Sequence, residues 1–157
     1  DGESEVKPDY NPRLEPIAWM VGEWESKHMS ATGELRKTRR LSVNWAANKQ
    51  VLVENLTGTK PDGTTAEAAI VTYYWNPQTK KINARALFSG SFIEEVTLLE
   101  AGDTEQVWES KMVFADGNQG LYKLKVTYNE DSYTMGWSKI SGSGPQDFGP
   151  FEHTRIK

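Results

Sequence analysis

From Glu23 to the C-terminus, apolar and polar residues alternate with period two, in runs separated by short turn-like segments. Period two places successive side chains on opposite faces of a β-strand, and the β-branched and aromatic residues that fill these runs favour strands. The pattern predicts ten strands, at residues 23–30, 35–46, 50–59, 65–75, 81–88, 91–100, 105–115, 121–129, 132–141 and 148–156.

The connections between these runs indicate how the strands pair. Most are two to five residues long, and Asp62-Gly63, Asp116-Gly117 and Asn76-Pro77 are turn-forming dipeptides. Parallel pairing needs a crossover of about a dozen residues, so neighbouring strands must be antiparallel. Because a long meander removes its exposed edges by closing, the sequence predicts an all-β fold: an up-and-down antiparallel closed β-barrel of about ten strands. A two-sheet sandwich would usually need a long connection, and only residues 142–147 approach one.

A short helical plug is expected before the first strand. Pro12 suits a first helical position, and Gly22 suits the end of the helix. Four apolar residues between them share a face at helical spacing: Leu14, Ile17, Ala18 and Val21. Residues 1–11 are polar and acidic, so we expect a flexible N-terminal segment followed by a single domain at 12–157. Such a start resembles a mature chain after signal-peptide removal, which predicts a secreted or periplasmic protein.

Composition excludes several classes of function. The 157 residues include no cysteine, which rules out disulfides and thiol chemistry. No apolar run is long enough for a membrane-spanning helix. The net charge is −4 and the two signs are mixed along the chain, so nucleic acid is not an expected partner. The basic cluster at residues 36–40 falls in a predicted strand, where a solvated face and one or two interior charges explain it. We expect a monomer or a homodimer.

The segment from Leu14 to Trp24, LEPIAWMVGEW, resembles a known family. A helical turn followed by Gly22-Glu23-Trp24 is similar to the start of lipocalins and nitrobindins, which belong to the calycins. The longer WMVGEW form looks more like exported bacterial lipocalin-like domains, found alone or with SnoaL-like domains. The segment YWNPQT at residues 74–79 and the basic Arg155 in the last strand extend the likeness. The resemblance implies that Gly22 turns the chain into the barrel, and that Arg155 stacks on Trp24 to close one end.

The resemblance to nitrobindins also raises haem binding. Nitrobindins hold haem through one histidine of the last strand, and His153 matches that place. Against this, Trp24 is followed by Glu25-Ser26-Lys27-His28 rather than by the glycine-rich continuation of nitrobindins. His28 and His153 without positioned carboxylates would make a poor metal site, so no metal is predicted.

The remaining candidates are aromatic and charged residues on predicted inward faces. Glu94 and Glu95 are adjacent, so one points inward, but both faces of their strand are mixed and the pattern does not decide which. An inward glutamate opposite Arg39 or Arg85 could orient a polar group of a ligand, whereas cross-strand pairing outside the barrel is the simpler alternative. The candidate ligand-binding residues are Arg39, Tyr74, Arg85, Phe88, Glu94, Trp108, Met112, Tyr122, Tyr133 and Trp137.

Three functions are consistent with these residues. The first is non-enzymatic binding of a small hydrophobic or flat ligand inside the barrel, with the aromatic residues supplying affinity. The second is haem binding through His153. The third is a structural or interaction domain whose barrel is filled by side chains. An enzyme is the least expected class, because no nucleophile motif, phosphate loop or acid–base pair stands out.

Overall fold

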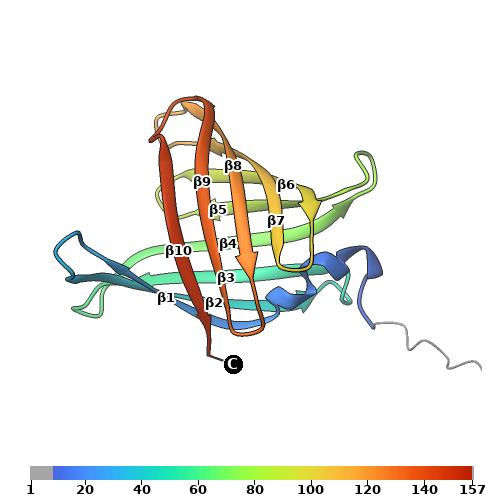
Figure 1. Cartoon of the computed structure of the whole chain (residues 1–157), viewed down its shortest axis with the longest axis horizontal. Coiled ribbons are helices and arrows are strands. Elements are labelled where there is room, and N and C mark those ends of the chain that lie inside the picture. The colour runs from blue at the N-terminus through green and yellow to red at the C-terminus, as the bar shows by residue number, and fades with distance from the viewer. Residues whose placement is uncertain (1–8, 157) are drawn as a thin grey trace, which may run out of the picture.

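The computed structural model describes residues 9–156 and confirms the predicted all-β closed barrel (Figure 1). A 3₁₀ helix precedes ten antiparallel strands, each of which pairs with its neighbours in the sequence until β10 returns to β1. The elements are η1 (Pro12–Met20), β1 (Gly22–Met29), β2 (Leu35–Ala46), β3 (Val51–Thr59), β4 (Thr65–Asn76), β5 (Lys81–Phe88), β6 (Phe92–Ala101), β7 (Glu105–Val113), β8 (Gln119–Tyr128), β9 (Ser132–Gly142) and β10 (Asp147–Arg155). Every predicted strand is present, with ends within two residues of those expected.

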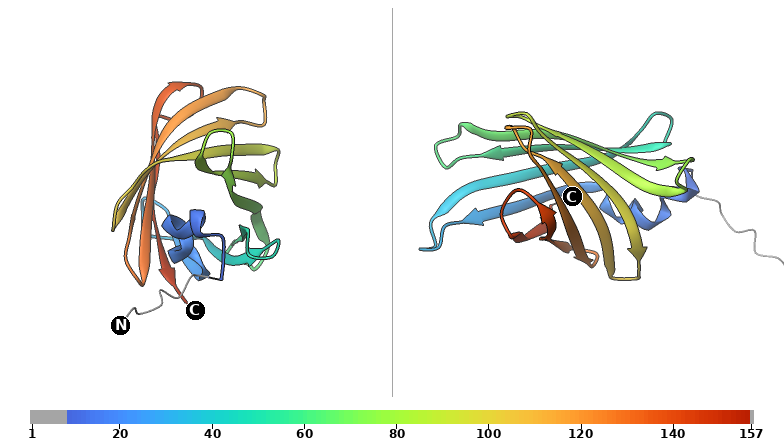
Figure 2. Two further views of the ribbon diagram at one scale, coloured as in Figure 1. Left: turned by 90° about the vertical axis from the view of Figure 1, so that its right-hand side faces the viewer. Right: turned by 90° about the horizontal axis from the view of Figure 1, so that it is seen from above.

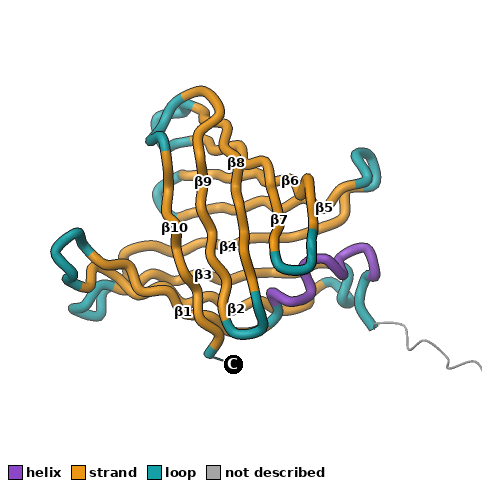
Figure 3. The backbone as a smooth tube through the Cα atoms, viewed as in Figure 1, coloured by secondary structure: helices purple, strands orange, loops and turns teal. Residues whose placement is uncertain are grey.

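The up-and-down order gives the barrel two distinct ends. The turns that follow β1, β3, β5, β7 and β9 lie at one end, which we call the mouth. The other turns lie at the opposite end, beside η1 (Figures 1 and 3). Two further views show η1 against this second end of the barrel (Figure 2). The closing seam is short, because β1 pairs with β10 at Trp24–Arg155 and Glu25–Thr154.

The inward faces follow the predicted alternation. Trp108, Ser110 and Met112 of β7 are buried, as are Tyr122, Leu124 and Val126 of β8. The structure also decides the mixed strand β6, where Glu94 is buried and Glu95 is exposed. Glu95 pairs with Arg85 outside the barrel, with 3.7 Å between Oε1 and Nε.

The plug is a 3₁₀ helix, and its buried face differs from the one expected. Leu14, Ile17 and Met20 are buried, whereas Ala18 and Val21 are only half-buried. A 3₁₀ helix has three residues per turn, so residues three apart eclipse one another and meet the core together. Asn11 caps the first turn by accepting a hydrogen bond from the Arg13 backbone amide.

Gly22, Trp24 and Arg155 form the closed end beside the plug. Gly22 has a φ of +136°, a conformation that favours glycine, at the point where the chain turns from η1 into β1. Trp24 is fully buried, and its Nε1 donates to the Met20 carbonyl at 2.9 Å. The Arg155 guanidinium lies 4.1 Å from the centre of the Trp24 ring. It also donates hydrogen bonds to the carbonyls of Val21, Trp19 and Glu130, which ties η1 and β1 to the last strand.

Within residues 9–156, no helix has the length and apolar character that crossing a membrane requires.

Candidate functional site

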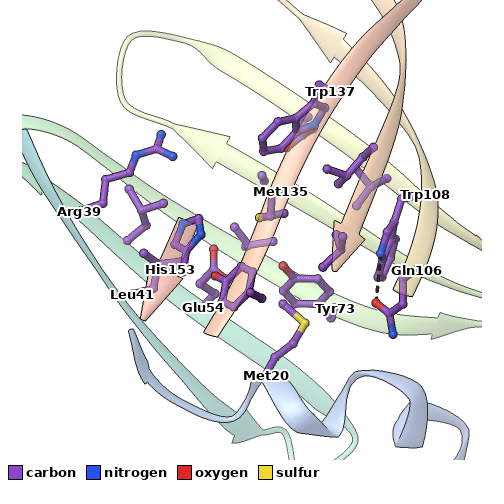
Figure 4. Close-up of a pocket in the computed structure, with 18 of the residues that line it drawn as sticks. Met20, Arg39, Leu41, Glu54, Tyr73, Gln106, Trp108, Met135, Trp137 and His153 are labelled. Atoms are coloured by element: carbon purple, nitrogen blue, oxygen red, sulfur yellow. Dashed lines mark hydrogen bonds between the residues drawn. The ribbon is translucent and has the colours of Figure 1, made fainter. Parts of the chain in front are cut away.

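The barrel interior is not filled by side chains. An inner cavity of about 70 Å³ lies next to η1, and Trp19 and Met20 of η1 line it. Figure 4 shows Met20 at this side of the cavity. Its walls come from nine of the ten strands and are mainly aromatic and aliphatic. A space of this size holds a few heavy atoms or two to four waters.

A second, more open pocket of about 320 Å³ lies at the mouth. The two spaces adjoin, because four residues line both: Arg39, Phe88, Glu94 and Trp137. Four more apolar side chains line the outer space: Phe92, Met112, Phe148 and Phe151. Its volume lies in the range of small-molecule pockets.

Glu94 is a buried carboxyl group held by two donors. The Ser110 hydroxyl donates to its Oε2 at 2.6 Å, and the Trp137 indole Nε1 donates to the same oxygen at 2.9 Å. Burial raises the pKa of Glu94, and these two hydrogen bonds oppose the increase. No hydrogen bond or ion pair joins Glu94 to Arg39 in the described chain, so the buried pair that the sequence offered as one alternative is not formed.

Glu54 is a second buried carboxyl group, and it lines the inner cavity (Figure 4). It is 6% exposed, and no described residue gives it a hydrogen bond or an ion pair. Burial raises its pKa to about 7, against the attraction of Arg39. A carboxyl group with this pKa exists in both protonation states near neutral pH.

Arg39 lies between the two spaces and is held by Glu67. Its Nη2 donates to Glu67 Oε2 at 3.1 Å, and its Nε donates to Oε1. Lys37 pairs with the same carboxylate at 2.9 Å. Burial would raise the pKa of Glu67, but the hydrogen bonds and charges of Arg39 and Lys37 lower it to about 2.

Gly58 makes the pairing of Arg39 with Glu67 possible. It is buried in β3, directly between Arg39 of β2 and Glu67 of β4 in the sheet register. A Cβ atom at Gly58 would lie 2.6 Å from Glu67 Cγ. The missing side chain therefore leaves the space across which the two charged groups meet.

His153 points into the inner cavity, where its ring stacks on Tyr133 at 4.4 Å between centroids. It is 2% exposed, and its Nδ1 is buried without a hydrogen-bond partner in the described chain. Burial and the charge of Arg39 lower its pKa to about 3, so the ring is neutral. His28 faces the mouth and stacks on Phe151, and burial lowers its pKa to about 4.

The surroundings of His153 do not fit a haem. The cavity of about 70 Å³ beside the ring is far smaller than a pocket for a drug-sized ligand, and Tyr133 stacks on one face of the ring. Among residues 9–156, no group of three or more metal-binding side chains comes together either.

Most of the candidates from the sequence meet in these two spaces. Trp108 and Tyr133 line the inner cavity, Met112 lines the mouth, and Arg39, Phe88, Glu94 and Trp137 line both. Tyr122 is buried but lines neither; its hydroxyl donates to the Pro145 carbonyl at 2.8 Å and so anchors the loop between β9 and β10.

Two candidates were placed on the wrong face. Tyr74 and Arg85 lie outside the barrel, in a surface pocket of about 320 Å³ that Glu95 and Lys111 also line. The reason is the period-two alternation itself: Tyr73, Ala84 and Ala86 point inward, so their neighbours Tyr74 and Arg85 must point outward.

Several residues that line the inner cavity were not among the site candidates, and Glu54 and Tyr73 are two of them. The signal for Glu54 was present, because it lies between Leu52 and Leu56 on the apolar face of its strand. A carboxylate in such a register is either a buried functional group or a break in the pattern.

The chain was compared with protein-family models and with curated proteins, and nothing in either comparison matches it.

Proposed function

We propose that this protein binds a small, flat or apolar molecule inside its barrel without transforming it. The observation that carries the proposal is the pair of adjoining spaces, an inner cavity of about 70 Å³ beside a mouth pocket of about 320 Å³. Aromatic rings from several strands line both, and such rings supply a large contact area with little loss of side-chain freedom. Glu54, Glu94 and Arg39 would orient a polar group of the ligand.

A lipocalin-like relationship agrees with this function. The ten-stranded closed barrel, the 3₁₀ plug and the stacking of Arg155 on Trp24 all support it. Since one barrel architecture hosts many functions, the proposal rests on the cavity rather than on the fold.

Native mass spectrometry of the protein, purified without refolding, tests the proposal. We expect an added mass that is lost on denaturation, because a largely apolar pocket of this size can hold an apolar ligand. The mass of the released molecule would then give its chemical class. A clean apo mass, together with no response to any small aromatic probe at millimolar concentration, would contradict the proposal.

An interaction domain is the second candidate, and one outer surface favours it. Ile70 of β4 and Leu87 of β5 are cross-strand partners that are 54% and 52% exposed. Ile93 of β6 lies opposite Leu87 and continues this apolar strip. Sizing chromatography of the Leu87→Lys variant tests this role, since an assembly through the strip would dissociate while a barrel that acts alone would elute unchanged.

A further inference from the structure

The inner cavity contains buried acidic groups without a matching cation. Glu54 and Glu94 both line it, and both are nine-tenths or more buried. Neither forms an ion pair with a described residue. A buried charge is stable only when it is paired or otherwise compensated, so an ionised pair of carboxylates here calls for a positive charge.

The basic groups nearby supply that charge only in part. Among the described residues, Arg39 is the only arginine or lysine that lines the inner cavity. Its charge opposes the rise in pKa of both glutamates, but it forms an ion pair with neither, because two of its nitrogen atoms donate to Glu67. His153 faces the cavity but is held neutral by burial. Its Nδ1 and the Glu54 carboxyl group therefore remain polar sites without partners in the described chain.

The walls suit a positively charged group in a second way. Trp108, Trp137 and Tyr73 line the cavity that Glu54 and Glu94 share. The face of an aromatic ring attracts a cation within about 6 Å of its centre, and this attraction grows when water is excluded. Aromatic faces together with unpaired carboxyl groups favour an ammonium group over a neutral or anionic one.

The two adjoining volumes define the shape of the ligand. About 70 Å³ holds an ammonium group with a few carbon atoms, while about 320 Å³ at the mouth holds a larger body. Phe92, Phe148 and Phe151 make that outer space suitable for a ring. Lys37 and Arg39 at the mouth are matched there by Glu67 and Glu94, so the mouth does not call for a second cationic group.

We infer that the ligand is a small organic monocation, a primary amine carrying a flat apolar body. Its ammonium group lies in the inner cavity with Glu54 and Glu94, and its body fills the mouth pocket. An ammonium group has three donors and no acceptor, which matches carboxylate oxygens that lack partners. This inference rests on the proposed function, because it names the class of molecule that the barrel would bind.

Titration calorimetry with three matched probes tests the inference at a pH of about 8: 2-phenylethylamine, the neutral 2-phenylethanol and the anionic 3-phenylpropanoate. We expect the amine to bind at least about tenfold more tightly than the other two, since it alone pairs with the carboxylates. In Glu54→Gln the ratio of the amine affinity to the alcohol affinity should fall by about tenfold. Glu95 follows Glu94 in β6 and is exposed, so Glu95→Gln is the matched control. It should show the same preference for the amine as the wild type.

The outcomes separate this inference from the proposed function. Equal or tighter binding of the alcohol or the anion would overturn the amine assignment and leave ligand binding in place. A retained apolar mass without amine binding would do the same. No binding of any probe and no retained mass would overturn the proposed function as well. Should Glu54→Gln fail to fold, Glu94→Gln provides the same comparison, because its amide oxygen still accepts from Ser110 and Trp137.

Discussion

At the scale of single residues, Glu94 and Glu54 are both buried but differ in the hydrogen bonds that they accept. Glu94 receives hydrogen bonds from Ser110 and Trp137, which stabilise its ionised form. Glu54 receives none from a described residue, and burial raises its pKa to about 7. Near neutral pH, Glu54 is therefore the group in this barrel whose charge responds most readily to a ligand.

This property predicts a pH-dependent stability for the Glu54→Gln variant. The pKa of Glu54 is raised from 4.5 to about 7 in the fold, so the folded protein favours the protonated form. The wild type then loses stability as the pH rises from about 4.5 through 7, whereas glutamine avoids this loss. We expect wild type and variant to be similar near pH 4, and the variant to be more stable by about 3 kcal/mol near pH 8.

Urea denaturation of both proteins across this pH range measures the difference. The charged and titratable groups that influence or face Glu54 are Arg39 of β2, Tyr73 of β4, Glu94 of β6, Tyr133 of β9 and His153 of β10. The lowered pKa of His153 acts in the opposite direction, because stability from a neutral histidine is lost as the pH falls below about 6.5. Because His153 is present in both proteins, its contribution cancels to first order in the difference between their free energies of unfolding. A stability difference that does not change with pH would show that Glu54 is not desolvated.

The sequence could have identified one of these glutamates but not the other. Leu52, Glu54 and Leu56 are buried, while Val53 is half-buried and Asn55 is exposed, so alternation places Glu54 on the same face as the two leucines. In β6, both faces carry apolar and polar residues in the sequence. A shift of the strand register by one residue would have turned Glu95 inward and Glu94 outward. Only the register of β6 against β5 and β7, which depends on the whole sheet, decides between them.

At the scale of elements, the closed end depends on one arginine that joins three segments. Arg155 of β10 donates to carbonyls of Trp19, Val21 and Glu130, and its guanidinium covers the Trp24 ring. This contact strengthens a seam where β1 and β10 share a short register. The plug, the first strand and the last strand are thus held together by a planar group with several fixed donors.

Replacing this arginine with lysine should destabilise the barrel while keeping the charge. Lysine has no planar fork, so it cannot reach all three carbonyls while stacking on Trp24. We expect Arg155→Lys to lower the free energy of unfolding by about 2 kcal/mol, in line with the loss of hydrogen bonds to a charged group. Urea denaturation measures it, and Arg85→Lys is the matched control at an exposed pair, where the effect should stay below about 0.5 kcal/mol. Equal losses of stability at the two positions would show that the contacts of Arg155 with Trp24 and the three carbonyls do not stabilise the closed end.

Element positions were more predictable than element faces. Short turns and period two gave each strand to within two residues, because hairpin chemistry is local in sequence. The plug was placed correctly, but α-helical spacing assigned Ala18 and Val21 to its buried face in place of Met20. Pro16 lies inside the nine-residue element and has no amide hydrogen to donate, so an α-helix here would lose one of its few hydrogen bonds.

At the scale of the whole molecule, one small residue on an inward face borders the cavity together with large rings. Ala86 of β5 is buried and lines the cavity, as do Trp108 and Tyr133. The sequence showed an excess of aromatic residues but could not show whether they fill the barrel, because that depends on strand tilt, stagger and rotamers together. The unfilled volume is a property of the closed sheet, and no local pattern encodes it.

Filling this volume separates ligand binding from barrel stability. Ala86 is buried and lines the inner cavity, so Ala86→Leu would place three more carbon atoms in a space of about 70 Å³. We expect the variant to keep its far-ultraviolet circular dichroism and to lose at least about tenfold in affinity for the ligand that the wild type retains. The matched control is Ala68→Leu on the exposed outer face of β4, which should leave the affinity unchanged. If a folded Ala86→Leu protein bound as tightly as the wild type, the ligand would lie at the mouth alone, and the inner cavity would serve only to accommodate the buried carboxyl groups.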